Sequence, residues 1–343
     1  MSSGTERRPA APSSTLGAKL RAAEARADLP PSDLTEGVPG VLERARGVML
    51  GLAVGDALGS TLEFGPRIAS VADFHTEMTG GGPFGLEPGQ WTDDTAQSLM
   101  LAKSLVAYQA FDPSDVMTRF VAWWRKGQGS CTGTCFDIGS TTRAALARYE
   151  RTGDPFAGSA DKNTAGNGSL MRLAPVALFA LDSESEAVRI AREQSRLTHA
   201  APQCLDACEF FVRLLRSTVL GQGHPLELGR WSGHPDINRA KAAIWGSQER
   251  RSIRSGGYVA DTLEAALWAV AGSSSFEQAL ISAVNLGGDA DTTGAVTGAL
   301  AGAKWGVSAI PKRWLDPLAW RFKLDGIAFN LIRTSSEVHR DRL

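Results

Sequence analysis

The sequence lacks the features that would place it in a membrane or on a nucleic acid. No part of its 343 residues offers the roughly 18 consecutive apolar residues that a membrane-spanning helix needs, and the N-terminus has no apolar signal-peptide core. The 36 basic and 37 acidic residues leave a formal net charge of −1, so no overall field attracts nucleic acid or an anionic membrane. We therefore expect a cytoplasmic protein with neither kind of partner.

Cysteine is also scarce, with four residues in two pairs, Cys131 with Cys135 and Cys204 with Cys208. If both stretches were helical, each pair would share one face, which leaves a four-thiolate zinc site open. Zinc knuckles favour a tighter C-x2-C spacing, and the second pair lies inside an amphipathic pattern. We therefore expect reduced thiols in the core rather than a structural zinc.

The first 40 residues differ in composition from the rest of the chain. They are rich in proline, alanine and serine and poor in large apolar residues, which predicts a largely mobile N-terminal extension over 1–40. Within it, leucines and alanines between 16 and 29 have near-helical spacing, so a short helix could order against a partner. The remainder predicts one large domain over 41–335 and a short tail over 336–343.

Apolar residues recur at helical spacing throughout that domain, and strand-like alternation is scarce. Helices are predicted around 96–106, 205–219, 262–271 and 276–284. Glycine recurs every four residues in two stretches, at Gly51, Gly55 and Gly59 and at Gly294, Gly298 and Gly302. Such small-residue faces let helices approach closely, so we expect a compact all-α domain.

Two acid clusters carry the clearest chemical signal. Residues 91–95 read Trp-Thr-Asp-Asp-Thr and residues 289–293 read Asp-Ala-Asp-Thr-Thr, each at a predicted helix start and neither with His or Cys. Their carboxylate and hydroxyl oxygens suit Mg²⁺ or Mn²⁺. Alternatively, Thr92 and Asp289 are simple N-caps and the acids complement the helix dipoles. Dipole compensation does not require two acids beside a hydroxyl twice, whereas a shared ion does.

These clusters are two of five motifs that together resemble the ADP-ribosylglycohydrolase family. The other three are Gly-Leu-Ala-Val-Gly-Asp-Ala-Leu-Gly at 51–59 followed by Glu63, Asn-Gly-Ser-Leu-Met-Arg at 167–172, and Leu-Thr-His at 197–199. All five occur in the family's order, and the resemblance runs from about Glu43 to about Trp305. It implies an ADP-ribosylglycohydrolase-type helical fold and hydrolysis of a glycosidic bond to ADP-ribose.

The resemblance also implies a centre of two Mg²⁺ or Mn²⁺ ions that polarises the ribose and activates water. The implied metal ligands are Thr92, Asp93, Asp94, Asp289, Asp291 and Thr292. Asp291 is expected to bridge the ions, and the expected catalytic residues are Glu63, Asp93 and Asp291. Asp56 is expected to bond to neighbouring backbone rather than to metal, because a buried carboxylate among Gly and Ala is costly unless it is satisfied.

Substrate contacts are implied for two further segments. The Asn167-to-Arg172 block is expected to open a helix whose free N–H groups cradle the diphosphate. A Cys-Phe-Asp-Ile-Gly-Ser segment at 135–140 is expected to line the ribose and phosphates, and His199 to contact the same part of the ligand. The implied substrate-binding residues are Phe136, Asp137, Gly139, Asn167, Gly168, Ser169 and His199.

Together these observations predict removal of ADP-ribose from a modified protein side chain, most readily arginine. A role as an immunity protein against an ADP-ribosylating toxin would fit the N-terminal extension, with a cognate ADP-ribosyltransferase as partner. Two alternatives stay open. The substrate could instead be O-acetyl-ADP-ribose or ADP-ribose linked to serine or nucleic acid. The chain could also be a binding protein that occludes a transferase through its extension.

Overall fold

The computed structural model describes residues 39–222, 231–245 and 248–340. These residues form helices and 3-10 turns with no strand, and only three isolated bridges pair extended residues. The predicted all-α class is therefore confirmed. The helix expected between 16 and 29 lies outside the described residues.

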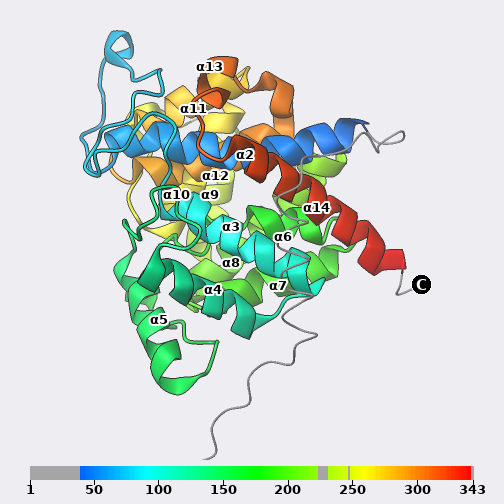
Figure 1. The fold of residues 1–343 in the computed structure, drawn as a ribbon. Coiled ribbons are helices and arrows are strands. Elements are labelled where there is room, and N and C mark those ends of the chain that lie inside the picture. Colours follow the sequence, from blue (N-terminus) through cyan, green and yellow to red (C-terminus); the bar gives the residue numbers. More distant parts are fainter. Residues whose placement is uncertain (1–38, 223–230, 246–247, 341–343) are drawn as a thin grey trace, which may run out of the picture.

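Thirteen α-helices of the described chain follow one another in sequence (Figure 1). They are α2 (Pro39–Gly59), α3 (Asp93–Tyr108), α4 (Pro113–Lys126), α5 (Ser140–Thr152), α6 (Ala174–Phe179), α7 (Glu184–Arg196), α8 (Pro202–Leu220), α9 (Pro235–Lys241), α10 (Val259–Ala271), α11 (Phe276–Val284), α12 (Ala290–Trp305), α13 (Lys312–Leu315) and α14 (Arg321–Arg340). The four helices predicted from apolar spacing are α3, α8, α10 and α11, so these predictions are confirmed. No helix in the described ranges is long and apolar enough to cross a bilayer.

Helices α2 and α12 run antiparallel at the centre of the fold and touch through glycine. Along their contact, four positions of α2 face four of α12: Gly47 with Gly302, Gly51 with Gly298, Gly55 with Gly294 and Gly59 with Ala290. A Cβ atom on any of these glycines would overlap backbone of the other helix, so no larger residue permits this approach. The small-residue faces predicted from sequence are therefore confirmed as a helix contact.

Helix α12 is enclosed by other helices, and all its residues from Ala290 to Ala303 are buried. Helices α10 and α11 pack against α12, while α14 crosses α2 and α3. Because α2 and α12 are antiparallel, the C-terminal end of α2 lies beside the N-terminal end of α12. The acid cluster at 289–293 is thereby brought to the end of the first glycine-rich helix.

We predict that Gly298→Ala lowers the free energy of unfolding by about 1–3 kcal/mol, because the added methyl overlaps the Gly51 carbonyl. Helix propensity alone would raise stability by up to about 1 kcal/mol, so the sign of the change identifies the overlap. Urea unfolding followed by circular dichroism measures it. Gly40→Ala is the matched control, because Gly40 is an exposed glycine of α2 whose added Cβ would meet only the Arg44 side chain, at 3.6 Å. A G298A midpoint equal to or above that of the wild type would contradict the close packing.

Candidate functional site

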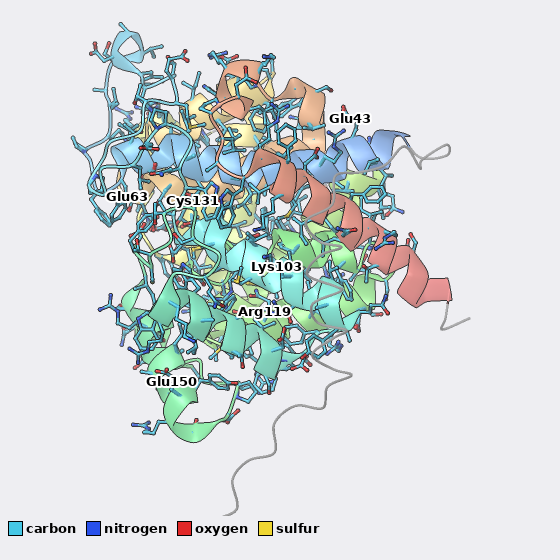
Figure 2. All side chains as sticks on the ribbon, viewed as in Figure 1. Glu43, Glu63, Lys103, Arg119, Cys131 and Glu150 are labelled. Atoms are coloured by element: carbon cyan, nitrogen blue, oxygen red, sulfur yellow. The ribbon has the colours of Figure 1, made fainter. Side chains whose placement is uncertain are left out.

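The candidate site lies where three helix ends meet. The C-terminal end of α2 runs into a 3-10 turn (Ser60–Leu62) and Glu63, and the N-termini of α3 and α12 point to the same place. Figure 2 shows Glu43 and Glu63 towards opposite ends of the α2 segment, so the site occupies one end of the central pair of helices.

The N-terminus of α3 is capped by a carboxylate from another helix. Asp56 of α2 accepts hydrogen bonds from the backbone N–H and the hydroxyl of Thr92, at 2.8 and 2.9 Å. It also accepts from the backbone N–H and the hydroxyl of Thr95, at 2.9 and 2.6 Å. These four bonds satisfy the buried carboxylate in the manner expected from sequence.

The N-terminus of α12 is capped in the same way by Glu63, whose Oε2 accepts from the backbone N–H of Ala290 at 2.7 Å and of Asp291 at 3.3 Å. The side chains of Thr92 and Asp289, the residues that precede α3 and α12, form no capping hydrogen bond. The simple-cap alternative therefore does not describe these two residues. Because Asp56 and Glu63 supply the caps of α3 and α12, the acids of the two clusters are not needed as helix caps.

Two groups of three carboxylates lie close enough to hold cations. Asp56, Asp94 and Asp291 form one group, and Glu63, Asp289 and Asp291 form the other, with the ligand atoms of each group within 4.8 Å of one another. Asp291 belongs to both groups, as a bridging ligand would. Within the described chain none of these carboxylates pairs with a basic side chain.

The residues present fit a pair of hard divalent cations. Oδ1 of Asp94 and Oδ2 of Asp291 are buried and have no hydrogen-bond partner, which is costly unless an ion or water binds them. The Thr292 hydroxyl approaches Asp94 at 3.3 Å and adds a neutral oxygen. An all-oxygen donor set of this kind suits Mg²⁺ or Mn²⁺.

Burial and mutual repulsion disturb the ionisation of these acids. Burial, and then the charge of Asp291, raises the pKa of Asp56 and of Asp289 to about 7. The same two causes raise the pKa of Asp93 and Glu63 well above the ordinary carboxylate range. Like charges this close resist ionising together, so a divalent cation would stabilise their charged forms.

A cavity of about 440 Å³ opens beside the carboxylates, a volume typical of small-ligand sites. Among the residues expected from sequence to act in the site, those lining it are Glu63, Asp93, Asp137, Gly139, Asn167, Gly168, His199, Asp289, Asp291 and Thr292. The structure thus brings together residues from six separate parts of the chain.

The remaining expected residues do not line this cavity. Thr92 and Asp94 lie among the buried carboxylates beneath it, where their oxygens approach each other at 3.3 Å. Phe136 packs against Phe84 with ring centroids 5.3 Å apart. The Ser169 hydroxyl is fully buried and accepts a hydrogen bond from Ser195 at 2.8 Å.

The Asn167-to-Arg172 block does not open a helix, which corrects the expectation from sequence. It forms consecutive turns, and α6 begins at Ala174. The turn is held because Asn167 donates from its side chain to Asp289 at 2.8 Å and to Thr262 at 2.9 Å. The block therefore meets the cavity through turn backbone at Gly168, without a helix dipole behind it.

Phe64 lines the cavity but was not identified from sequence. It follows Glu63 directly, has a positive φ of 58° and is 69% exposed. Its backbone N–H donates to the Gly288 carbonyl at 2.7 Å, and its ring meets Phe84 edge-on at 6.2 Å. A bulky residue in this backbone conformation is rare and tends to mark function. Asp137, at φ 56°, shares this conformation.

None of the four cysteines belongs to either group of carboxylates in the described chain. Cys131 and Cys135 are in a loop, whereas Cys204 and Cys208 are buried in α8. Burial raises the pKa of Cys131 to about 12 and of Cys135 to about 11, and raises those of the other two as well. Such thiols stay protonated near neutral pH and are poor metal ligands in that form.

Comparisons with known proteins agree on one family. A family profile described as ADP-ribosylglycohydrolase matches residues 38–340. An ADP-ribosylarginine hydrolase Tri1 of Pseudomonas putida is 42% identical over 299 residues, which are 87% of this chain and 80% of the relative. An ADP-ribosyl-(dinitrogen reductase) glycohydrolase of Rhodospirillum rubrum is 37% identical over 282 residues, covering 82% and 92% of the two chains.

A solved structure titled "ADP-ribosylglycohydrolase-related protein complex" superposes on this chain with a TM-score of 0.76. Its sequence is 43% identical, and the match covers 86% of this chain and 99% of that one.

The raised pKa values predict how stability depends on pH and metal. A folded chain with raised carboxyl pKa values holds protons that the unfolded chain releases, so this contribution to stability is complete below pH 4 and is lost as pH rises through 7. We expect the melting temperature of metal-free protein to fall between pH 5 and pH 8. We also expect added Mn²⁺ to raise it more at pH 8 than at pH 5, because only ionised acids bind the ion.

Calorimetry with and without chelator measures both effects. Asp291→Asn should weaken them, because it removes the carboxylate common to both groups. Asp316→Asn is the control, since that acid is exposed and paired with Lys312. A melting temperature at pH 8 that does not change when Mn²⁺ is added would contradict the metal assignment.

Proposed function

Because the chain belongs to the ADP-ribosylglycohydrolase family and is therefore a glycosidic-bond hydrolase, we propose that it removes ADP-ribose from arginine side chains with two Mg²⁺ or Mn²⁺ ions. The observation that carries this proposal is the pair of carboxylate groups that share Asp291 at the floor of the cavity. Two relatives are both named ADP-ribosylarginine hydrolase Tri1, which supports the choice of arginine.

Asp56 and Glu63 of the two carboxylate groups already accept backbone hydrogen bonds as helix caps. The proposed ligands are therefore the other members, Asp94, Asp289 and Asp291, with Asp93 of the same cavity and the hydroxyls of Thr92 and Thr292. When bound, the ions would polarise the ribose hydroxyls and lower the pKa of a coordinated water. Every other step belongs to the chain. Gly168 and the His199 ring line the cavity, where a diphosphate or ribose oxygen of ADP-ribose could accept hydrogen bonds from them.

Hydrolysis forms a bond between a water oxygen and the anomeric carbon and breaks the bond from that carbon to the guanidino nitrogen. We assign the proton transfer to Glu63, whose Oε2 is held by the α12 backbone and whose side chain lines the cavity. The proton then passes to the departing nitrogen. Burial and the charge of Asp291 raise the pKa of this carboxyl in the metal-free site, and bound divalent cations would favour the ionised form that accepts a proton.

The leaving guanidinium is a planar cation, and the rim of the cavity offers it complementary surfaces. The exposed Phe64 ring can stack on a planar cation, and Asp137 lies near Asp93 and Asp291 at the same cavity. A serine hydroxyl would use neither surface. This difference favours an arginine linkage over a serine linkage.

We expect the full chain with Mn²⁺ to release ADP-ribose from an arginine-linked peptide faster than from a serine-linked peptide or O-acetyl-ADP-ribose. Asp93→Ala and Asp291→Ala should reduce kcat at least about a hundredfold with an unchanged far-UV spectrum, because they remove proposed ligands without removing core volume. Phe64→Leu should lower kcat/KM about tenfold on the arginine linkage and little on the serine linkage. Phe322→Leu, at an exposed phenylalanine of α14, is the control.

Equal rates on arginine and serine linkages would overturn the proposed specificity. Wild-type rates in either aspartate variant would overturn the proposed metal site. Turnover of O-acetyl-ADP-ribose or ADP-ribosylated nucleic acid alone would move the function to the corresponding alternative.

We further propose the domain division expected from sequence, in which residues 1–40 bind a partner and the rest catalyses. The partner proposed is a cognate ADP-ribosyltransferase, which the chain would occlude as an immunity protein. Removal of residues 1–38 should leave hydrolysis of a small arginine-linked substrate unchanged and weaken binding to that transferase, because an extension that orders on contact contributes interface area. Equal binding by the truncated and full chains, measured by calorimetry, would contradict the partner role.

A further inference from the structure

Arg172 is fully buried beneath the cavity and forms no ion pair with a described acid. Its guanidinium donates to Oε1 and to the backbone carbonyl of Gln194, at 3.0 and 2.9 Å. It also donates to Gln97 Oε1 at 2.8 Å and to Thr198 Oγ1 at 2.8 Å, and it lies 4.7 Å from the Phe120 ring centroid. A buried cation with only neutral hydrogen-bond partners is costly, so its retention calls for a role.

The first chain of hydrogen bonds runs from Arg172 to the acid site. A guanidinium only donates, so the amide of Gln97 must turn its carbonyl oxygen towards Arg172. Its amide nitrogen then faces the other way and donates to Asp93 Oδ2 at 2.8 Å. Arg172 thereby delivers a hydrogen-bond donor to a carboxylate that lines the cavity.

The second chain runs from Arg172 to His199. The Thr198 hydroxyl accepts from Arg172, so its single proton is free to point to Nδ1 of His199, which lies 2.7 Å away. Nδ1 is then the unprotonated nitrogen of the ring. Burial and the charge of Arg172 lower the pKa of His199 to about 3, so the ring is neutral near pH 7 and its one proton belongs on Nε2.

Nε2 of His199 faces the turn at the cavity wall. It lies near Gly166 and Gly168, where an added Cβ would come within 3.4 and 3.3 Å of it. Both glycines and the histidine line the cavity, and no described side chain accepts a bond from Nε2. The nitrogen is therefore available to a ligand oxygen.

We propose that Arg172 is a positioning residue that sets the direction of both hydrogen-bond chains, so that the cavity receives an acceptor at Asp93 and an Nε2–H donor at His199. This inference rests on the proposed function only for the identity of the ligand, since the donor would serve a phosphate or ribose oxygen of ADP-ribose. Asp93 is held as an acceptor for a cation. Arg172 thus places a hydrogen-bond acceptor, Asp93, and a hydrogen-bond donor, Nε2 of His199, in the lining of the cavity.

The protonation of His199 can be observed directly in the full-length protein. Long-range ¹H–¹⁵N NMR of the histidine rings, with His199→Gln to assign the signal, should show a proton on Nε2 in the wild type. Thr198→Ser keeps the hydroxyl and should keep this signature. Thr198→Val removes it and should give a mixture of the two tautomers, because nothing then donates to Nδ1.

Binding measurements should distinguish the two series of hydrogen bonds that start at Arg172. Thr198→Val should weaken ADP-ribose binding and raise KM about tenfold, as loss of a hydrogen bond to a charged ligand does, with Mn²⁺ binding and kcat nearly unchanged. Gln97→Met should weaken Mn²⁺ binding about tenfold by freeing Asp93, with the His199 tautomer unchanged. Thr334→Val is the matched control, because this buried threonine of α14 bonds only within its helix, to Asn330.

Several results would overturn the inference. One is a proton on Nδ1 of His199 in the wild type, and another is wild-type ADP-ribose affinity in Thr198→Val. A Thr334→Val effect equal to that of Thr198→Val would show a general loss of stability instead of positioning. Absence of ADP-ribose binding in the wild type would count against the proposed function, while the NMR signature would still decide the direction of the Thr198 bond.

Discussion

The contact between α2 and α12 is the constraint on which the rest of the site depends. Glycine at matched positions of both helices lets their backbones touch, and this brings the C-terminal end of α2 to the N-terminal end of α12. At that spacing Glu63 reaches backbone N–H groups of α12, while Asp56 of α2 reaches those of α3. The glycines therefore determine where the acids stand, although they take no part in the chemistry.

In the metal-free protein, the buried acids of this site destabilise the folded state. Oδ1 of Asp94 and Oδ2 of Asp291 are buried without a hydrogen-bond partner, and burial makes the charged forms of the cluster acids costly. Divalent cations would relieve that cost, so affinity for metal and instability without it have the same origin. Arg172 is the fully buried cation nearby in the described chain, and it reaches Asp93 only through Gln97.

Much of the fold could be predicted because it depends on local patterns. Apolar spacing identified α8, α10 and α11, and the four-residue glycine repeats identified a close helix contact. Details that depend on contacts between distant segments could not be predicted. The turn at 167–172 is held by Asp289 and Thr262, and the left-handed Phe64 is held by Gly288. The local sequence does not reveal these distant partners. For this reason the segment at 167–172 was expected to open a helix, and Phe64 was not identified.

The central claim is that the acid clusters at the starts of α3 and α12 form one metal site with Asp291 in common. Anomalous diffraction from crystals grown with Mn²⁺ tests it most directly, because it locates each ion without reference to activity. The account predicts two peaks, one between Asp94 and Asp291 and one between Asp289 and Asp291, consistent with the two carboxylate groups. No peak at these carboxylates, or ions bound without Asp291, would contradict it.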